Sequence, residues 1–244
     1  MNLNAFFHPR RLVPTIAASA ALWAIAPGAA FATDYCVQDA GCAGSGGTPK
    51  ASVDAALTAA DADAAPDRVL VGPGFYLSPV GGYHASSNPV QLIGAGAGAT
   101  TLTGPVDTGT VLALQNHASS VSDLTIAIPY GATGAPKYGL KMQAGRSARR
   151  IAITVDPNMP IWTIGADLET GALLEDSSVT LPPGTAGTWG AKAIQANVRG
   201  TTITAMAGLV VGGSNNQFDR DQITAVGGPG IESAAISATA RAPC

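Results

Sequence analysis

The chain has 244 residues, which is enough for one large domain or two small ones. Only 12% of the residues are charged, against about 25% in a typical soluble domain, so the surface relies on Ser, Thr, Asn, Gln and backbone groups. Thirteen Lys and Arg stand against 16 Asp and Glu without a basic cluster, which excludes the electrostatic footprint of a nucleic-acid-binding protein.

Residues 1–32 have the pattern of an export signal. Arg10 and Arg11 precede an apolar stretch that Pro14 and Pro27 interrupt, and Ala30-Phe31-Ala32 forms an A-x-A cleavage pattern. An uncleaved anchor helix is the alternative, but it needs roughly 20 unbroken apolar residues. Sec export and twin-arginine export both stay open. We expect a secreted protein, extracellular or at the cell surface, without a membrane span once the signal is removed.

The three cysteines predict one local disulfide. An exported chain can keep disulfides, and Cys36 and Cys42 enclose a tight five-residue segment. Cys244 has no partner, which we interpret as the sign of a longer parent protein that continues past this residue. The cysteines and histidines show no zinc-ligand spacing, so we expect neither a metal nor another cofactor.

Residues 33–66 are expected to form an N-terminal cap. Ser52 is a suitable N-cap for a short helix over residues 53–60, and Pro66 lies beyond its end. Four apolar residues share one face of that helix: Val53, Ala56, Leu57 and Ala60. A solenoid needs its open end covered, and this helix would cover it.

From residue 67 to residue 244 a two-part sequence pattern repeats, in which a polar corner separates two short apolar runs. The first runs align on Leu70, Leu92, Leu112, Leu140, Ala166, Ala191, Leu209 and Ile231, and the second on Leu102, Ile126, Ile153, Val179, Ile203 and Ile223. The runs alternate with period two and are rich in β-branched residues.

A unit of about 24 residues that repeats in phase distinguishes a solenoid from a sandwich of hairpins, which predicts a flat series of similar strands. Stacked coils bury a continuous apolar interior and bond their backbones to the coils above and below. We therefore predict an all-β solenoid, a right-handed parallel β-helix of about seven coils, and a monomer.

The opening of this region resembles that of secreted right-handed parallel β-helix proteins. After the capping helix come residues 67–76 (DRVLVGPGFY), 90–96 (VQLIGAG) and 100–102 (TTL), as in pectate lyases, pectin methylesterases and their bacterial relatives. The resemblance spans residues 48–238 and implies the fold. It implies no chemistry, because the catalytic motifs of the polygalacturonases, the methylesterases and the calcium-dependent lyases are missing.

Charged residues alternate in sign at equivalent positions of successive coils. Three such columns stand out: Arg149, Glu175, Arg199 and Asp219; Asp123, Arg150, Asp176 and Arg220; and Lys141, Asp167 and Lys192. Stacking places like positions about 4.8 Å apart, where opposite charges attract, so we expect structural ladders. The functional alternative makes acid pairs of Glu175 with Asp176, or Asp219 with Asp221, for glycoside cleavage.

Three Pro- and Gly-rich insertions lengthen consecutive units at 129–138, 156–164 and 182–190. Each follows the second run, so the three loops should share one edge of the solenoid. Their candidate ligand-binding residues are Tyr130, Tyr138, Asp156, Trp162 and Trp189. Aromatic rings on rigid loops stack on sugars, and Tyr138, Trp162 and Trp189 would form a row spaced by the coil rise. The alternative is that the rings plug a hydrophobic corner.

Three functional classes follow. The first is a secreted module that binds polysaccharide without a recognisable catalytic constellation. The second is a polysaccharide lyase or glycoside hydrolase whose catalytic coils are missing or unrecognised, and the third is a structural cell-surface or adhesin rod. An enzyme would need a convergent set of titratable groups in one groove. The inserted edge offers a single carboxylate, Asp156, with Lys137 nearby.

Overall fold

The computed structural model describes residues 32–62, 64–106, 109–129, 137–156, 162–182, 188–227, 230–234 and 239–241, with the backbone alone from residue 231 onward. The predicted export signal up to residue 31, Tyr130 and Cys244 therefore lie outside the described residues. No helix in the part of the chain that the structure describes is long and apolar enough to cross a membrane.

The chain first forms a small cap of two short strands and two helices. These elements are β1 (Asp34–Val37), α1 (Ala40–Gly44), β2 (Thr48–Pro49) and α2 (Val53–Asp61). The predicted disulfide between Cys36 and Cys42 is present and ties β1 to α1. Gly47 packs so closely that a Cβ atom there would lie 2.4 Å from the Cys36 sulfur, so only glycine fits beside the disulfide.

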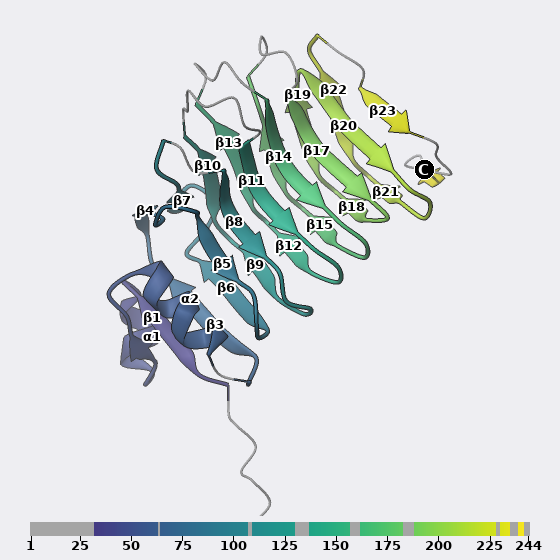
Figure 1. Cartoon of the computed structure of the whole chain (residues 1–244). Coiled ribbons are helices and arrows are strands. Elements are labelled where there is room, and N and C mark those ends of the chain that lie inside the picture. Colours follow the sequence, from purple (N-terminus) through teal and green to yellow (C-terminus); the bar gives the residue numbers. More distant parts are fainter. Residues whose placement is uncertain are drawn as a thin grey trace, which may run out of the picture.

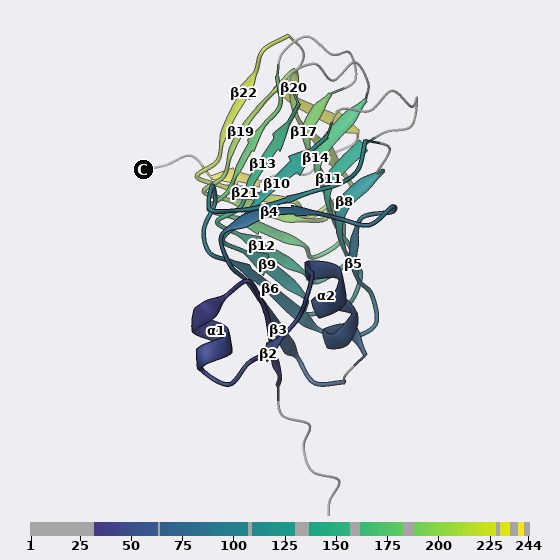
Figure 2. The same ribbon diagram turned by 90° about the vertical axis from the view of Figure 1, so that its left-hand side faces the viewer.

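Helix α2 has the features expected from the sequence. The Ser52 hydroxyl accepts a hydrogen bond from the Ala55 N–H at 3.1 Å, and the four predicted apolar residues are all buried. The helix packs against β3 and β5 at the first coil (Figure 2). Strand β1 pairs with β3, so the sheet already begins within residues 33–66.

After the cap, the chain winds through three strands per coil (Figure 1). Sheet A consists of β2, β1, β3 (Asp67–Val71), β6 (Val90–Gly94), β9 (Ser120–Ser122), β12 (Ser147–Arg149), β15 (Leu173–Glu175), β18 (Asn197–Arg199), β21 (Gln217–Asp219) and β24 (Thr239–Arg241). Sheet B consists of β4 (Gly74–Leu77), β7 (Thr100–Thr103), β10 (Thr125–Ile128), β13 (Ala152–Val155), β16 (Ser178–Thr180), β19 (Thr202–Ala205) and β22 (Gln222–Ala225). Sheet C consists of β5 (Tyr83–Ala85), β8 (Thr110–Leu114), β11 (Lys137–Met142), β14 (Thr163–Leu168), β17 (Trp189–Ile194), β20 (Ala207–Gly212) and β23 (Ile231–Ala234).

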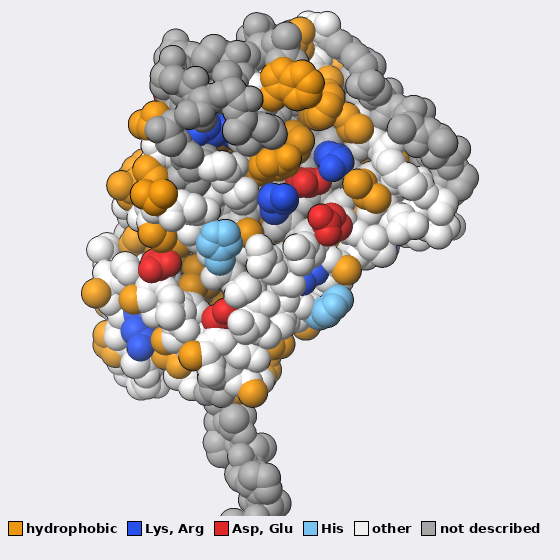
Figure 3. Space-filling model, in the orientation of Figure 1, with side chains coloured by type: hydrophobic (Ala, Val, Ile, Leu, Met, Phe, Trp, Pro, Cys, Tyr) orange, Lys and Arg blue, Asp and Glu red, His pale blue; other side chains and the backbone are white. Residues whose placement is uncertain are grey.

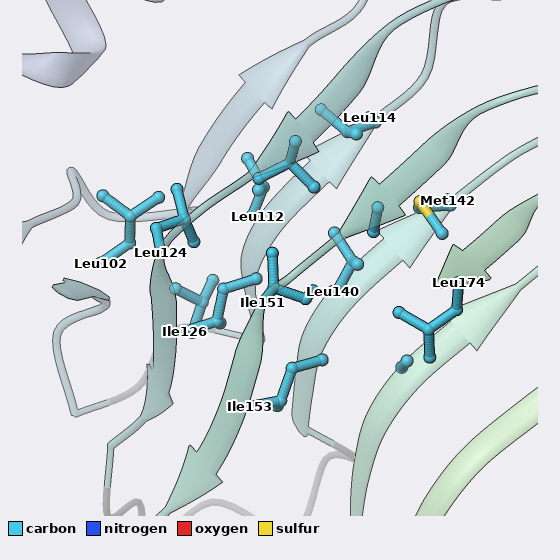
Figure 4. Close-up of a cluster of buried hydrophobic side chains, with 14 of the residues drawn as sticks. Leu102, Leu112, Leu114, Leu124, Ile126, Leu140, Met142, Ile151, Ile153 and Leu174 are labelled. Carbon is cyan, nitrogen blue, oxygen red and sulfur yellow. The ribbon is translucent and has the colours of Figure 1, made fainter. Parts of the chain in front are cut away.

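Neighbouring strands within each sheet come from successive coils and run parallel. This order is that of a right-handed parallel β-helix, as the sequence predicted. Leucine and isoleucine side chains from sheets A, B and C point into one continuous core inside the coils, which the three sheets enclose (Figure 4).

The predicted second runs are the strands of sheet B. Ile126 pairs in register with Leu102 on one side and Ile153 on the other, and the column continues to Ile223. The first runs are strands of sheet C from Leu112 onward, but the predicted alignment of Leu70 and Leu92 with that column is wrong. Both residues lie in sheet A, and the residue that pairs with Leu112 in the first coil is the buried Tyr83.

A column of glycines lets sheets B and C approach each other. Gly139, Gly165, Gly190 and Gly208 occupy equivalent places in successive strands of sheet C. A Cβ atom at Gly190 would lie 2.2 Å from Ile203 Cγ2, and one at Gly208 would lie 2.3 Å from Ile223 Cγ2. Sheet B side chains fill the space that a side chain at these positions would need.

Candidate functional site

The first charge column runs along the outer face of sheet A in the register that the sequence predicts. Arg149 pairs with Glu175, Glu175 with Arg199, and Arg199 with Asp219. The Arg149 Nε lies 3.0 Å from Glu175 Oε2 and 3.8 Å from Asp176 Oδ2. Opposite charges on neighbouring coils therefore face each other along this column.

The second column forms the corner between sheets A and B. Asp123, Arg150, Asp176, Gly200 and Arg220 all have left-handed backbones, with φ between 48° and 59°. Arg150 donates two hydrogen bonds to the Asp123 carboxylate, at 2.6 and 2.7 Å, and these hydrogen bonds hold the pKa of Asp123 below its ordinary value. A residue here must turn the chain, and Asp123 and Arg150 also pair their charges across neighbouring coils.

The carboxylates considered as acid pairs for glycoside cleavage make structural contacts at this corner and on the adjoining sheet A. The Asp221 carboxylate accepts hydrogen bonds from the backbone N–H groups of Thr201, at 2.8 Å, and Asp219, at 3.1 Å. Burial raises the pKa of Asp221 although these hydrogen bonds oppose it. Glu175 is engaged with Arg149 on sheet A. Both pairs are thus tied to backbone or to arginine side chains.

The third column lies on the outer face of sheet C. Lys141, Asp167 and Lys192 pair in register, and the Lys192 Nζ lies 3.5 Å from the Asp167 carboxylate. Asp167 is only 4% exposed, and its Oδ1 accepts no hydrogen bond within the described residues. Since this Oδ1 is also the atom that faces Lys192, the Asp167 charge is balanced within sheet C.

The three insertions connect sheet B to sheet C, so they share one edge as predicted. Trp162 comes just before β14 and is 58% exposed, while Trp189 begins β17 and is half-buried. Their ring centroids lie 6.0 Å apart in an edge-to-face arrangement. The exposure of Trp162 is that of a surface ring rather than a corner plug.

The strand register contradicts the expected single row of three rings. Tyr138 pairs with Ile164, and Ile164 pairs with Trp189, so an isoleucine separates the two aromatic residues of that row. Trp162 lies two residues ahead of Ile164 and reaches Trp189 from the side. Trp162 and Trp189 therefore form a pair of rings, whereas Tyr138 lies two coils from Trp189 in the strand register.

Aromatic and charged residues share the outer face because the glycine column interrupts the strand alternation. Tyr138 and Lys141 are three residues apart and would face opposite sides of a regular strand. Gly139 and Leu140 both face the interior, and the Lys141 Nζ lies 4.7 Å from the centre of the Tyr138 ring. The same spacing of three residues relates Ile164 to Asp167 and Trp189 to Lys192.

This combined surface, made of Tyr138, Lys141, Trp162, Asp167, Trp189 and Lys192, is the candidate site, called here the sheet C face. In Figure 3, large hydrophobic side chains lie next to basic and acidic side chains on the side of the molecule that sheet C forms. In the sequence, an aromatic or apolar residue followed by glycine and then, three residues after the first, by a charged residue indicates that the first and the last share the outer face.

The predicted site residue Asp156, and Lys137, which the sequence placed near it, lie apart from this surface. Asp156 directly follows β13, at the sheet B end of its insertion, whereas the rings lie at the sheet C end. Lys137 is 1% exposed, and its Nζ donates a hydrogen bond to the Val106 carbonyl oxygen at 2.6 Å. Within the described residues, no three His, Cys, Asp or Glu side chains come together as a metal site would require.

No family model and no curated protein match the chain. The chain is similar to solved pectin methylesterases. One, in complex with a hexasaccharide, is 10% identical over 84% of this chain and 81% of that one, with a TM-score of 0.46. The pectin methylesterase PemA from Erwinia chrysanthemi is 10% identical over 84% of this chain and 81% of that one, with a TM-score of 0.44. The pectin methylesterase from carrot is 10% identical over 86% of this chain and 89% of that one, with a TM-score of 0.39. The assignment of the fold rests on the strand order of this chain itself.

Proposed function

We propose that this chain is an exported β-helix protein that binds a polysaccharide on the sheet C face. The observation that carries the proposal is the exposed Trp162 ring, set against Trp189 beside the row of Lys141, Asp167 and Lys192. A sugar ring presents an apolar face and a rim of hydroxyls. Aromatic rings stack on the first, and charged side chains form hydrogen bonds with the second.

The rigidity of the scaffold supports this use. The rings and charges sit on or directly before strands whose backbones bond to both neighbouring coils, so little freedom is lost on binding. Stacking of a sugar on exposed rings at a strand face predicts affinities from about millimolar to micromolar. Export agrees with the disulfide in the cap and with the A-x-A pattern at residues 30–32.

The test uses affinity electrophoresis in gels that contain one soluble polysaccharide each, across pectins, xylans, mannans and α- and β-glucans. The parent protein should be retarded by at least one of them. Trp162→Ala should weaken that retardation by about tenfold, since one stacking contact is lost. Its melting temperature should stay within about 2 °C of the parent, because the ring is largely exposed.

The matched control is Phe75→Ala in β4. Phe75 is 70% exposed and lies in sheet B, so the change removes an aromatic ring of similar exposure from another face. This variant should be retarded like the parent. The proposal is wrong if no polysaccharide retards the parent, or if Phe75→Ala and Trp162→Ala weaken retardation equally. If no polysaccharide retards the parent, the alternative function as a structural cell-surface or adhesin rod is favoured.

A further inference from the structure

From β7 onward, the outer face of sheet B carries two columns of small, hydroxyl-rich side chains, which follow the exposed Phe75 and Leu77 on β4. The first column contains Thr101, Thr125, Ala152, Ser178, Thr202 and Gln222, and the second contains Thr103, Ala127, Thr154, Thr180, Thr204 and Thr224. From β13 onward the second column is threonine in four successive strands. The strands that carry it, β13, β16, β19 and β22, are neighbours in sheet B, and β13, β19 and β22 can be followed in Figure 2.

These four threonine hydroxyls are free within the described residues. Closer to the cap, the Thr103 hydroxyl donates to the Ala127 carbonyl oxygen, and the Thr125 hydroxyl accepts from the Gly98 N–H. No such bond occupies Thr154, Thr180, Thr204 or Thr224 in the described structure, and three of the four are exposed, while Thr204 is half-buried. The free part of the face is therefore at its C-terminal end.

The arrangement is regular in both directions. Successive coils place equivalent hydroxyls about 4.8 Å apart, and positions i and i+2 of one strand are separated by about 6.6 Å. Thr202 and Thr204 in β19 provide such a pair, with Ser178 and Thr180 beside them on β16. A β-branched side chain has few χ1 rotamers, so the hydroxyls and methyl groups are held in a nearly fixed pattern.

Charge complementarity decides what such a face can bind. The two columns contain no charged residue, whereas the adjoining corner and sheets A and C carry ion pairs. A phosphate backbone or an anionic lipid surface would find no cation here. The natural complement is an extended neutral surface with its own regular array of hydrogen-bonding groups.

Crystalline water matches this description. The planes of ice present rows of neutral oxygens whose repeats are similar in size to the two spacings of the threonine array. Fixed hydroxyls can enter such a lattice by hydrogen bonding, and the methyl groups between them can occupy its hollows. A crystalline polysaccharide is the other regular neutral surface, but the four strands from β13 to β22 carry no aromatic ring that could stack on sugars, and the exposed Phe75 lies at the cap end of the face, on β4.

We propose that the outer face of sheet B, centred on Thr180 and Thr204, binds ice. This activity is independent of the sheet C face. The binding would need no pocket, because many weak contacts in one rigid array act together.

The test measures the fraction of protein that enters a slowly growing ice hemisphere, and the size of ice crystals after annealing. The parent protein should be enriched in the ice and should keep the crystals small. Thr180→Tyr places a bulky ring in the centre of the array and should lower the captured fraction by about tenfold or more. Thr204→Tyr, one coil further, should act in the same way.

Gln217→Tyr is the matched control, because Gln217 is an exposed strand residue on sheet A. It should enter ice like the parent, as should Trp162→Ala, which separates this proposal from polysaccharide binding on the sheet C face. Circular dichroism and the melting temperature of each variant establish that it is folded.

Three results would overturn the proposal. The first is a parent protein that enters ice no more than an inert globular protein does. The second is a loss of capture in Gln217→Tyr as complete as that in Thr180→Tyr. The third is retention of the parent on crystalline cellulose or chitin through Thr180 without entry into ice, which would show that the face binds crystalline polysaccharide.

Discussion

Arg149 and Glu175 lie opposite each other on neighbouring coils, with the Arg149 Nε 3.0 Å from Glu175 Oε2. The same column continues through Arg199 to Asp219 with alternating sign. Since parallel strands place identical faces of the chain beside each other, a column of like charges would repel along its whole length. Alternation is therefore a requirement of the stacked register and not a sign of an acid pair for catalysis.

The first prediction concerns this column. Arg149→Glu places a carboxylate beside Glu175 and Asp176, and should lower the free energy of unfolding by about 0.5–1 kcal/mol, a small loss because the arginine side chain is half exposed. Combining it with Glu175→Arg should recover part of the loss. Urea denaturation of the two single variants and the double variant measures the coupling. A double variant no more stable than the worse single one would contradict the pairing.

The second prediction concerns the glycine column. Gly190→Ala brings a methyl group within 2.2 Å of Ile203 Cγ2 and 2.6 Å of the Gly208 carbonyl oxygen. Because the backbone oxygen cannot move without breaking the sheet, we expect a loss of about 2–3 kcal/mol in the free energy of unfolding. Gly109→Ala is the control, since a Cβ atom there would meet nothing within 4 Å. Equal melting temperatures for the two variants would show that sheets B and C are not in such close contact.

The sequence predicts sheet B and the charge columns correctly for a simple reason. From β7 onward, strands of sheet B alternate clearly and place a large β-branched or leucine residue inward in every coil, as with Ile126 and Ile153. The separation from this anchor to the charged corner is constant, so the charge columns follow from it. The sheet A strands from β9 to β21 have three residues each and a single inward residue, such as Ala148, which gives no pattern to detect.

The candidate site was predicted in part for a related reason. The insertions could be placed on one edge because they all follow sheet B. The relation between rings and charges depends on the glycine column, where two consecutive residues such as Gly139 and Leu140 face the interior. Alternation with period two places Tyr138 and Lys141 on opposite faces, so the sequence alone separates groups that the structure joins.

The last prediction concerns the carboxylate that fastens the capping helix to the first coil. Asp61, at the end of α2, accepts hydrogen bonds from the backbone N–H groups of Ser86, Ser87 and Asn88 at 3.1, 2.7 and 2.9 Å, and from the Ser86 hydroxyl at 3.0 Å. Burial by itself raises the pKa of Asp61, but the hydrogen bonds from Asn88, Ser87 and Ser86 outweigh it, and the pKa lies below its ordinary value.

A carboxyl group with a lowered pKa in the folded state stabilises the fold above its unfolded pKa, about 4, and this contribution is lost as the pH falls through the lower folded value. Asp61→Asn should therefore cost about 1–2 kcal/mol at pH 7, and the difference from the parent should shrink below about pH 4. Urea denaturation at pH 7, 5 and 3 measures the difference directly.

Asp54→Asn is the matched control for this prediction, because Asp54 is an exposed carboxylate of the same helix. Its effect should amount to the few tenths of a kcal/mol that a charge contributes at a helix N-terminus. A pH-independent loss in Asp61→Asn would mean that the shape of the side chain, rather than its charge, fastens the cap. A loss in Asp54→Asn as large as that in Asp61→Asn would assign the effect to the helix as a whole and contradict the role of the Asp61 hydrogen bonds.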